Sequence, residues 1–143
     1  MRRKRLSHIS EKPCKLNILV DVSGSMNREL VRRVVATIND SCNLTSENRL
    51  ITWNTRLVND IDLSNFNGKF GVGGGTDIMA GIDWCIKQGM EELIVISDME
   101  THMGELPELN KYIKLKFIVY NSSNFETNVE YKYLRDNCEY IVM

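Results

Sequence analysis

Short apolar runs alternate along this chain with segments in which apolar residues recur every three or four positions, and this alternation constrains the fold most. Nearly continuous aliphatic runs, typical of strands buried on both faces of a sheet, occupy residues 16–20, 93–96, 115–120 and 140–143. Helical spacing is found at about 26–42 and 78–90, with shorter helices expected around 106–113 and 129–137. Strands that alternate with helices require right-handed crossovers. The pattern therefore predicts an α/β fold with a doubly wound, mainly parallel sheet and helices on both faces.

Residues 49–53 and 56–63 add two strands, which brings the predicted sheet to six strands. Only two residues separate them, and so short a connection favours an antiparallel hairpin. In the second of these strands, Leu57, Ile61 and Leu63 share one face and alternate with polar residues. We therefore expect one antiparallel strand at an edge of the sheet.

Charge is distributed unevenly along the 143 residues, although the net charge is only −1. Residues 1–15 hold six basic side chains and one acidic side chain, whereas the remainder holds 12 basic and 18 acidic ones. An acidic body favours cation binding and argues against a broad nucleic-acid surface. We interpret residues 1–14 as a basic, flexible N-terminal segment and residues 15–143 as a single domain. Contact of the basic segment with RNA, an acidic partner or a membrane surface is the alternative.

The cysteines Cys14, Cys42, Cys85 and Cys138 are far apart and form no Cys-x-x-Cys pair. The sequence shows no secretory signal, and no uncharged apolar run approaches the roughly 20 residues of a membrane span. These features favour reduced thiols in a cytoplasmic protein, with a disulfide pair in a secreted protein as the alternative.

Three separated segments, 21–25, 73–77 and 97–98, carry oxygen-bearing side chains where an apolar run ends or a helical pattern begins. Carboxylate and hydroxyl oxygens are hard donors, which suit Mg²⁺ or Mn²⁺ and suit soft metals poorly. The candidate metal ligands are Asp21, Ser23, Ser25, Thr76 and Asp98.

Sheet topology predicts that these segments meet. In an open α/β sheet, ligands bind beyond the carboxyl ends of the strands, where the strand order reverses. If strand 16–20 is central, with the hairpin on one side and the fourth strand on the other, Asp21 and Asp98 end neighbouring strands. Taken singly, the residues also suit structural roles, since Ser25 and Thr76 could be helix N-caps. Their joint occurrence at three strand–helix junctions favours the metal site.

The Asp-x-Ser-x-Ser pattern that begins at Asp21, followed by Thr76 and Asp98, resembles the metal-ion-dependent adhesion site of von Willebrand factor A domains. The resemblance covers nearly the whole chain and implies a doubly wound sheet with one antiparallel edge strand. It also implies that Ser23, Ser25 and Thr76 bind Mg²⁺ directly or through water, while the two aspartates act largely through water. An acidic side chain of a protein partner would complete the coordination.

Two subgroups of that family are especially similar. Residues 73–77, Trp84 and residues 98–101 resemble the corresponding domain of Ro-type RNA-binding proteins. Residues 20–26 and 52–56 resemble bacterial A domains associated with metallopeptidase regions. The chain has no room for the companion domain of either group. The Ro-like residues and the basic N-terminus make a ribonucleoprotein role, with contact to RNA, the alternative function.

An enzyme is the less favoured class. Asp21 could be the nucleophile of a Mg²⁺-dependent phosphohydrolase, but Ser23 stands where such enzymes place a second aspartate. The glycine run also lacks the Lys-Ser/Thr of a phosphate-binding loop. Asp77 and Glu100 are expected near the same edge, either supporting the metal or as ordinary surface acids, and His102 as a solvated loop residue. We therefore expect a non-enzymatic module that binds a protein partner through Mg²⁺ or Mn²⁺.

Overall fold

The computed structural model describes residues 16–22, 28–41, 48–65, 77–120 and 124–143. Within them, the strands are β1 (Asn17–Asp21), β2 (Arg49–Trp53), β3 (Leu57–Asp62), β4 (Glu92–Ser97), β5 (Lys114–Val119) and β6 (Glu139–Val142). The α-helices are α2 (Arg28–Ser41), α3 (Ile78–Lys87), α4 (Leu106–Leu109) and α5 (Lys132–Asn137), and the 3₁₀ turns are η1 (Leu63–Asn65) and η2 (Val129–Tyr131). None of these helices is long and apolar enough to cross a membrane. The predicted alternation of strands and helices is confirmed.

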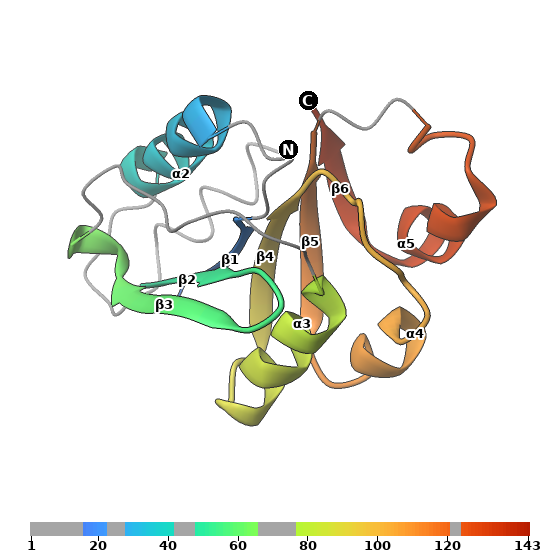
Figure 1. The fold of residues 1–143 in the computed structure, drawn as a ribbon, viewed down its shortest axis with the longest axis horizontal. Coiled ribbons are helices and arrows are strands. Elements are labelled where there is room, and N and C mark those ends of the chain that lie inside the picture. The colour runs from blue at the N-terminus through green and yellow to red at the C-terminus, as the bar shows by residue number, and fades with distance from the viewer. Residues whose placement is uncertain (1–15, 23–27, 42–47, 66–76, 121–123) are drawn as a thin grey trace.

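All six strands belong to one sheet in the order β3-β2-β1-β4-β5-β6 (Figure 1). Neighbouring strands are parallel, except that β3 runs antiparallel to β2 at one edge. This confirms the predicted mixed sheet, with β1 central and the hairpin on one side. The chain moves outward from β1 to β3 and then returns to form β4 on the other side of β1. The strand order therefore reverses between β1 and β4. Because these two strands are parallel, their carboxyl ends lie along the same edge of the sheet, the edge that strand ends form and not the one that strand β3 forms.

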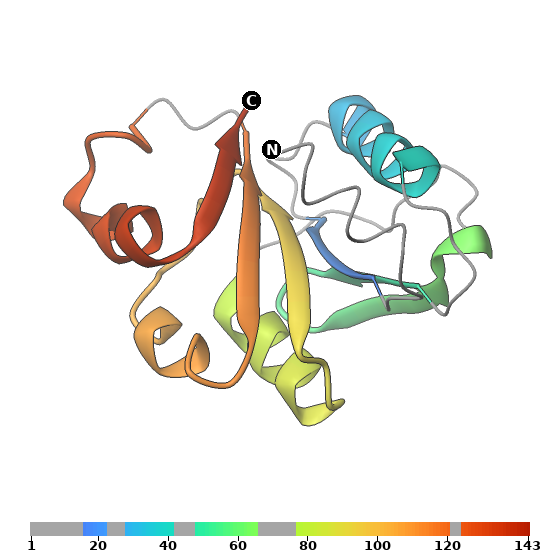
Figure 2. The same cartoon turned by 180° about the vertical axis from the view of Figure 1, so that it is seen from behind.

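The core consists of two apolar clusters, because successive residues of a buried strand point to opposite faces of the sheet. Ile18 and Val20 of β1 belong to one cluster, and Leu19 belongs to the other. The first cluster includes Val31, Val34, Val35 and Ile38 of α2. The second includes Ile78, Met79, Ile82 and Cys85 of α3, Leu106 of α4 and Leu134 of α5. Helix α2 thus packs on one face and α3, α4 and α5 on the other, as the opposite views of Figures 1 and 2 show.

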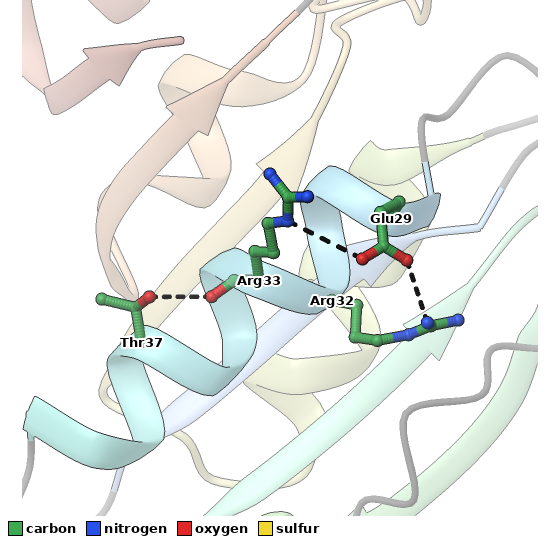
Figure 3. Close-up of polar contacts among 4 residues, drawn as sticks. All are labelled: Glu29, Arg32, Arg33 and Thr37. Atoms are coloured by element: carbon green, nitrogen blue, oxygen red, sulfur yellow. Dashed lines mark hydrogen bonds and ion pairs between the residues drawn. The ribbon is translucent and has the colours of Figure 1, made fainter.

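The solvent-facing side of α2 carries local polar contacts (Figure 3). Oε2 of Glu29 lies 2.9 Å from Nη1 of Arg32, and Oε1 lies 3.7 Å from Nε of Arg33. The Thr37 hydroxyl donates to the carbonyl oxygen of Arg33 at 2.8 Å. Exposed pairs at this spacing stabilise a helix by only about 0.2–0.5 kcal/mol each. The apolar face of α2, packed on the sheet, therefore contributes most of the stability of this helix.

Helix α4 is shorter than the predicted segment 106–113. After Leu109 the backbone continues in tight turns, with the amide of Lys111 donating to the carbonyl of Glu108 and that of Tyr112 to Leu109. Bonds between residues three apart belong to 3₁₀ geometry, which is common where a helix ends. The short helix was predicted at this place in the chain, but its length was overestimated.

Strand β3 differs from the prediction at its first residue. The register pairs Thr52 with Asn59, but the next residue, Trp53, pairs with Leu57, which marks a β-bulge. A bulge inserts one extra residue and changes which face the following side chains occupy. Leu57 is consequently 37% exposed, whereas Ile61 packs against the core. The prediction that Leu57 shares one face of the strand with Ile61 was wrong.

Candidate functional site

The carboxyl ends of β1 and β4 form the centre of the candidate site. The parallel register pairs Val20 with Ile96, so Asp21, the last residue of β1, lies opposite Ser97, the last residue of β4. Asp98 follows directly. The two aspartates thus end neighbouring parallel strands at the point where the strand order reverses, as the sequence predicted.

Both carboxyl groups are buried at this edge. Asp21 is 1% exposed and Asp98 is 3% exposed. The Ser97 hydroxyl donates to Oδ2 of Asp21 at 3.0 Å, and the amide of Glu100 donates to Oδ1 of Asp98 at 3.1 Å. Burying a carboxylate is costly unless hydrogen bonds or a cation compensate the lost hydration. Two buried carboxyl groups at one sheet edge are therefore the strongest chemical feature of the described residues.

The hydroxyl donors of the predicted set, Ser23, Ser25 and Thr76, lie outside the described residues. Their convergence with Asp21 and Asp98 stays a prediction.

Helix α3 begins at the same edge and has an aspartate cap. Oδ1 of Asp77 accepts a hydrogen bond from the amide of Ala80 at 3.2 Å, and the Asp77 amide donates to the carbonyl of Asn54 at 2.8 Å. Asp77 is therefore the N-cap of α3, so the alternative role of Thr76 as that cap was wrong. Asp77 is therefore more than an ordinary surface acid, because its side chain stabilises the start of α3.

His102 bridges two acidic side chains in the loop after β4. Its Nε2 lies 3.5 Å from Oδ1 of Asp77, and its Nδ1 lies 3.0 Å from Oε2 of Glu105. His102 is 57% exposed, as expected of a solvated loop histidine, but it also contacts these two acidic side chains. Since these side chains are 39–58% exposed, the contacts contribute little to stability, but they link the start of α3 to the start of α4.

The turn after β4 contains residues whose role the sequence did not reveal. Met99 is fully buried and has a φ of +65°, a left-handed conformation that is unfavourable for a residue with a Cβ atom. Its amide donates to Oγ of Ser97 at 2.9 Å, and its carbonyl oxygen accepts from the Tyr131 hydroxyl at 2.8 Å. In the sequence, Ser97 and Met99 were noticed only as members of their segments, and Tyr131 gave no signal.

Tyr131 reaches this turn from η2, in the connection between β5 and β6. Its ring stacks on that of Phe125, with 5.3 Å between the ring centroids. Burial raises the pKa of the Tyr131 hydroxyl, and the nearby acids Glu130, Asp98 and Glu100 raise it further. The phenol therefore keeps its proton at neutral pH and remains a hydrogen-bond donor to Met99.

Three buried polar atoms near the ends of strands β2 and β4 have no hydrogen-bond partner within the described part of the chain. They are Oγ1 of Thr52, Nε1 of Trp53 and Oγ1 of Thr101. Trp53 is opposite Asp21 in the register. Its ring packs over Gly81 of α3, where a Cβ atom would lie 3.1 Å from Cγ of the indole. The glycine thus permits the close approach of α3 to this edge.

The donor chemistry fits a hard divalent cation. The described residues contain no group of three or more His, Cys, Asp or Glu side chains that could hold a metal. The predicted site does not need such a group, because it combines two carboxylates with hydroxyls and retained water. Asp21 and Asp98 are the described residues that could hold the cation.

Comparison of the chain with protein-family models and with curated proteins gives no match.

Proposed function

We propose that this protein is a non-enzymatic binding module that uses Mg²⁺ or Mn²⁺ to recognise a protein partner. The observation that supports this most is the pair of buried aspartates on neighbouring parallel strands at the reversal of strand order. Ligand sites in open α/β sheets occur at such positions. Hard oxygen donors there suit these cations.

In this proposal, Ser23, Ser25 and Thr76 bind the cation directly, and Asp21 and Asp98 hold water molecules bound to it. The carboxylates partly neutralise the cation, so that it retains affinity for an anionic group. When bound, the cation supplies a coordination position for an acidic side chain of the partner. Because the binding energy comes from association alone, no bond of the partner needs to break.

The resemblance in sequence and the two buried acids support a more specific form of this proposal. We propose a metal-ion-dependent adhesion site of the von Willebrand factor A type in a cytoplasmic protein. The free thiols of Cys85 and Cys138 agree with a reducing compartment.

Isothermal titration with Mn²⁺ and Mg²⁺, extended to the low-millimolar range, tests the cation site. The intact chain is expected to bind one cation, and Asp21→Ala should weaken binding by at least tenfold. Asp136→Ala is the matched control, because Asp136 is an exposed aspartate at the end of α5, which leads into the amino end of β6. Absence of cation binding, or equal binding by Asp21→Ala, would refute the proposal.

Pull-down from lysate with Mg²⁺ or with a chelator tests the partner. Proteins held only with Mg²⁺ by the intact chain, and lost with Asp21→Ala, are expected. A phosphate-ester assay separates binding from catalysis. Turnover that disappears in Asp21→Asn would contradict the non-enzymatic class.

A further inference from the structure

A continuous series of hydrogen bonds connects Tyr131, in η2, with Asp21 through the ends of strands β4 and β1. The Tyr131 hydroxyl donates to the carbonyl of Met99, the Met99 amide donates to Oγ of Ser97, and the Ser97 hydroxyl donates to Oδ2 of Asp21. All four residues are buried, between 0% and 9% exposed. The contacts are therefore protected from competition with water, which makes their direction and geometry well defined.

The Ser97 hydroxyl has one proton, and its surroundings determine where that proton points. Its oxygen already accepts the backbone amide of Met99, which can only donate. The hydroxyl proton is therefore donated to Oδ2 of Asp21, at 3.0 Å. Ser97 thus restricts rotation of the Asp21 carboxylate about its terminal bond.

The turn at Met99 keeps Ser97 in this arrangement. A residue with a Cβ atom adopts φ of +65° only when its surroundings enforce it. Tyr131 anchors the Met99 carbonyl, and the stacked ring of Phe125 holds Tyr131. In addition, Arg135 donates from Nη1 to the carbonyls of Phe125 and Asn128. These two hydrogen bonds stabilise the segment between β5 and β6 that carries Tyr131.

We propose that Ser97 is a positioning residue for the cation site, with Tyr131 supporting it through Met99. This inference rests on the proposed function. Ser97 holds one oxygen of Asp21, so the cation, or a water molecule bound to it, meets a carboxylate whose orientation is already set. Without the hydroxyl, one of the contacts that orient the Asp21 carboxylate is lost, and affinity falls.

The expected effect can be scaled from other metal sites. Residues that orient ligands without touching the metal typically change affinity by 10–100-fold. We expect Ser97→Ala to weaken Mn²⁺ binding by about tenfold, at the lower end because Asp21 acts through water. Tyr131→Phe, which acts two contacts further away, is expected to weaken it by about threefold, and Ser97→Thr, which retains the hydroxyl, should restore most of the affinity.

The experiment measures Mn²⁺ affinity by isothermal titration for these variants and for Thr52→Val. Thr52 is a matched control, because its buried hydroxyl on the neighbouring strand β2 has no hydrogen-bond partner among the residues that the structure describes. The free energy of unfolding is measured separately by urea titration in excess chelator. A purely structural role of Ser97 would lower that free energy and leave the Mn²⁺ affinity of the folded protein unchanged.

Combining Ser97→Ala with Asp21→Ala tests whether Ser97 acts through Asp21. If it does, the double variant binds Mn²⁺ no more weakly than Asp21→Ala alone. Additive losses would overturn the positioning role. If Ser97→Ala does not fold, Tyr131→Phe provides the same test, and an affinity within measurement error of the intact chain would overturn the inference.

These outcomes separate the two proposals. Failure of the intact chain to bind Mn²⁺ would remove the proposed function and the inference with it. Binding by the intact chain that is lost with Asp21→Ala but unchanged with Ser97→Ala and Tyr131→Phe would remove only the positioning role.

Discussion

The left-handed backbone of Met99 leads to a prediction that the usual difference in stability between glycine and alanine substitutions disappears at this position. Met99 is fully buried, so its replacement by alanine should destabilise the protein by about 2–5 kcal/mol. Glycine normally destabilises further. It increases the freedom of the unfolded chain by about 0.4–1 kcal/mol, and it removes one more buried carbon, worth about 0.8 kcal/mol.

At a φ of +65°, glycine has a compensating advantage. A residue with a Cβ atom is disfavoured there by about 1–2 kcal/mol, and this cost disappears in Met99→Gly but persists in Met99→Ala. The two opposing effects are of similar size. We therefore expect Met99→Gly and Met99→Ala to have nearly the same free energy of unfolding.

Met103 is the matched control. It lies in the same loop, is 6% exposed and has no positive φ. Met103→Gly should therefore be about 1–2 kcal/mol less stable than Met103→Ala. Urea unfolding in excess chelator measures all four variants. If glycine is as unfavourable relative to alanine at position 99 as at position 103, the reasoning from the strained turn is refuted.

Three further perturbations test other parts of the structure. Gly81→Ala should lower the free energy of unfolding by about 1 kcal/mol, since its Cβ would lie 3.1–3.2 Å from Trp53 and Leu19 in a packed core. A variant as stable as the parent in urea unfolding would contradict this. Burial raises the pKa of Cys85 from its ordinary value of 9.0 to about 12. The stabilising contribution of the protonated, buried thiol is thus present below pH 9 and is lost as the pH rises toward 12. In chemical unfolding, the stability of the parent relative to Cys85→Ala should therefore fall above pH 9. A difference that does not change with pH would show that the thiol is not buried. Finally, Mn²⁺ at about ten times its dissociation constant should stabilise the chain by about 1.4 kcal/mol over chelator in thermal unfolding. If Asp21→Ala weakens binding by tenfold or more, the same Mn²⁺ concentration should stabilise that variant by at most about 0.4 kcal/mol.

Much of the fold followed from local patterns. The aliphatic runs predicted buried strands, and the apolar spacing in 26–42 and 78–90 predicted α2 and α3. The short connection before β3 predicted the antiparallel edge strand, and crossover handedness then restricted the order of the sheet. These features were predictable because periodicity and turn length act within a few residues of the chain.

The position of the candidate site was also predictable in part. Asp21 and Asp98 follow aliphatic runs, and neighbouring parallel strands bring their carboxyl ends to one edge. Ser97, by contrast, is an ordinary residue at the end of a strand in the sequence. Its bond to Asp21 spans 76 positions, so its role depends on strand register rather than on any local motif.

The sequence alone therefore determined the alternation of elements, the class of sheet and the edge at which the acids occur. Only the tertiary structure decided the exposure of Leu57, the strained turn at Met99 and the contact of that turn with Tyr131, 32 positions away. Hydrophobic periodicity is a property of neighbouring residues and survives in the sequence as a pattern. A bulge, a backbone angle or a hydrogen bond between distant residues depends on how packed elements fit together. The spacing of residues along the chain therefore does not predict such features.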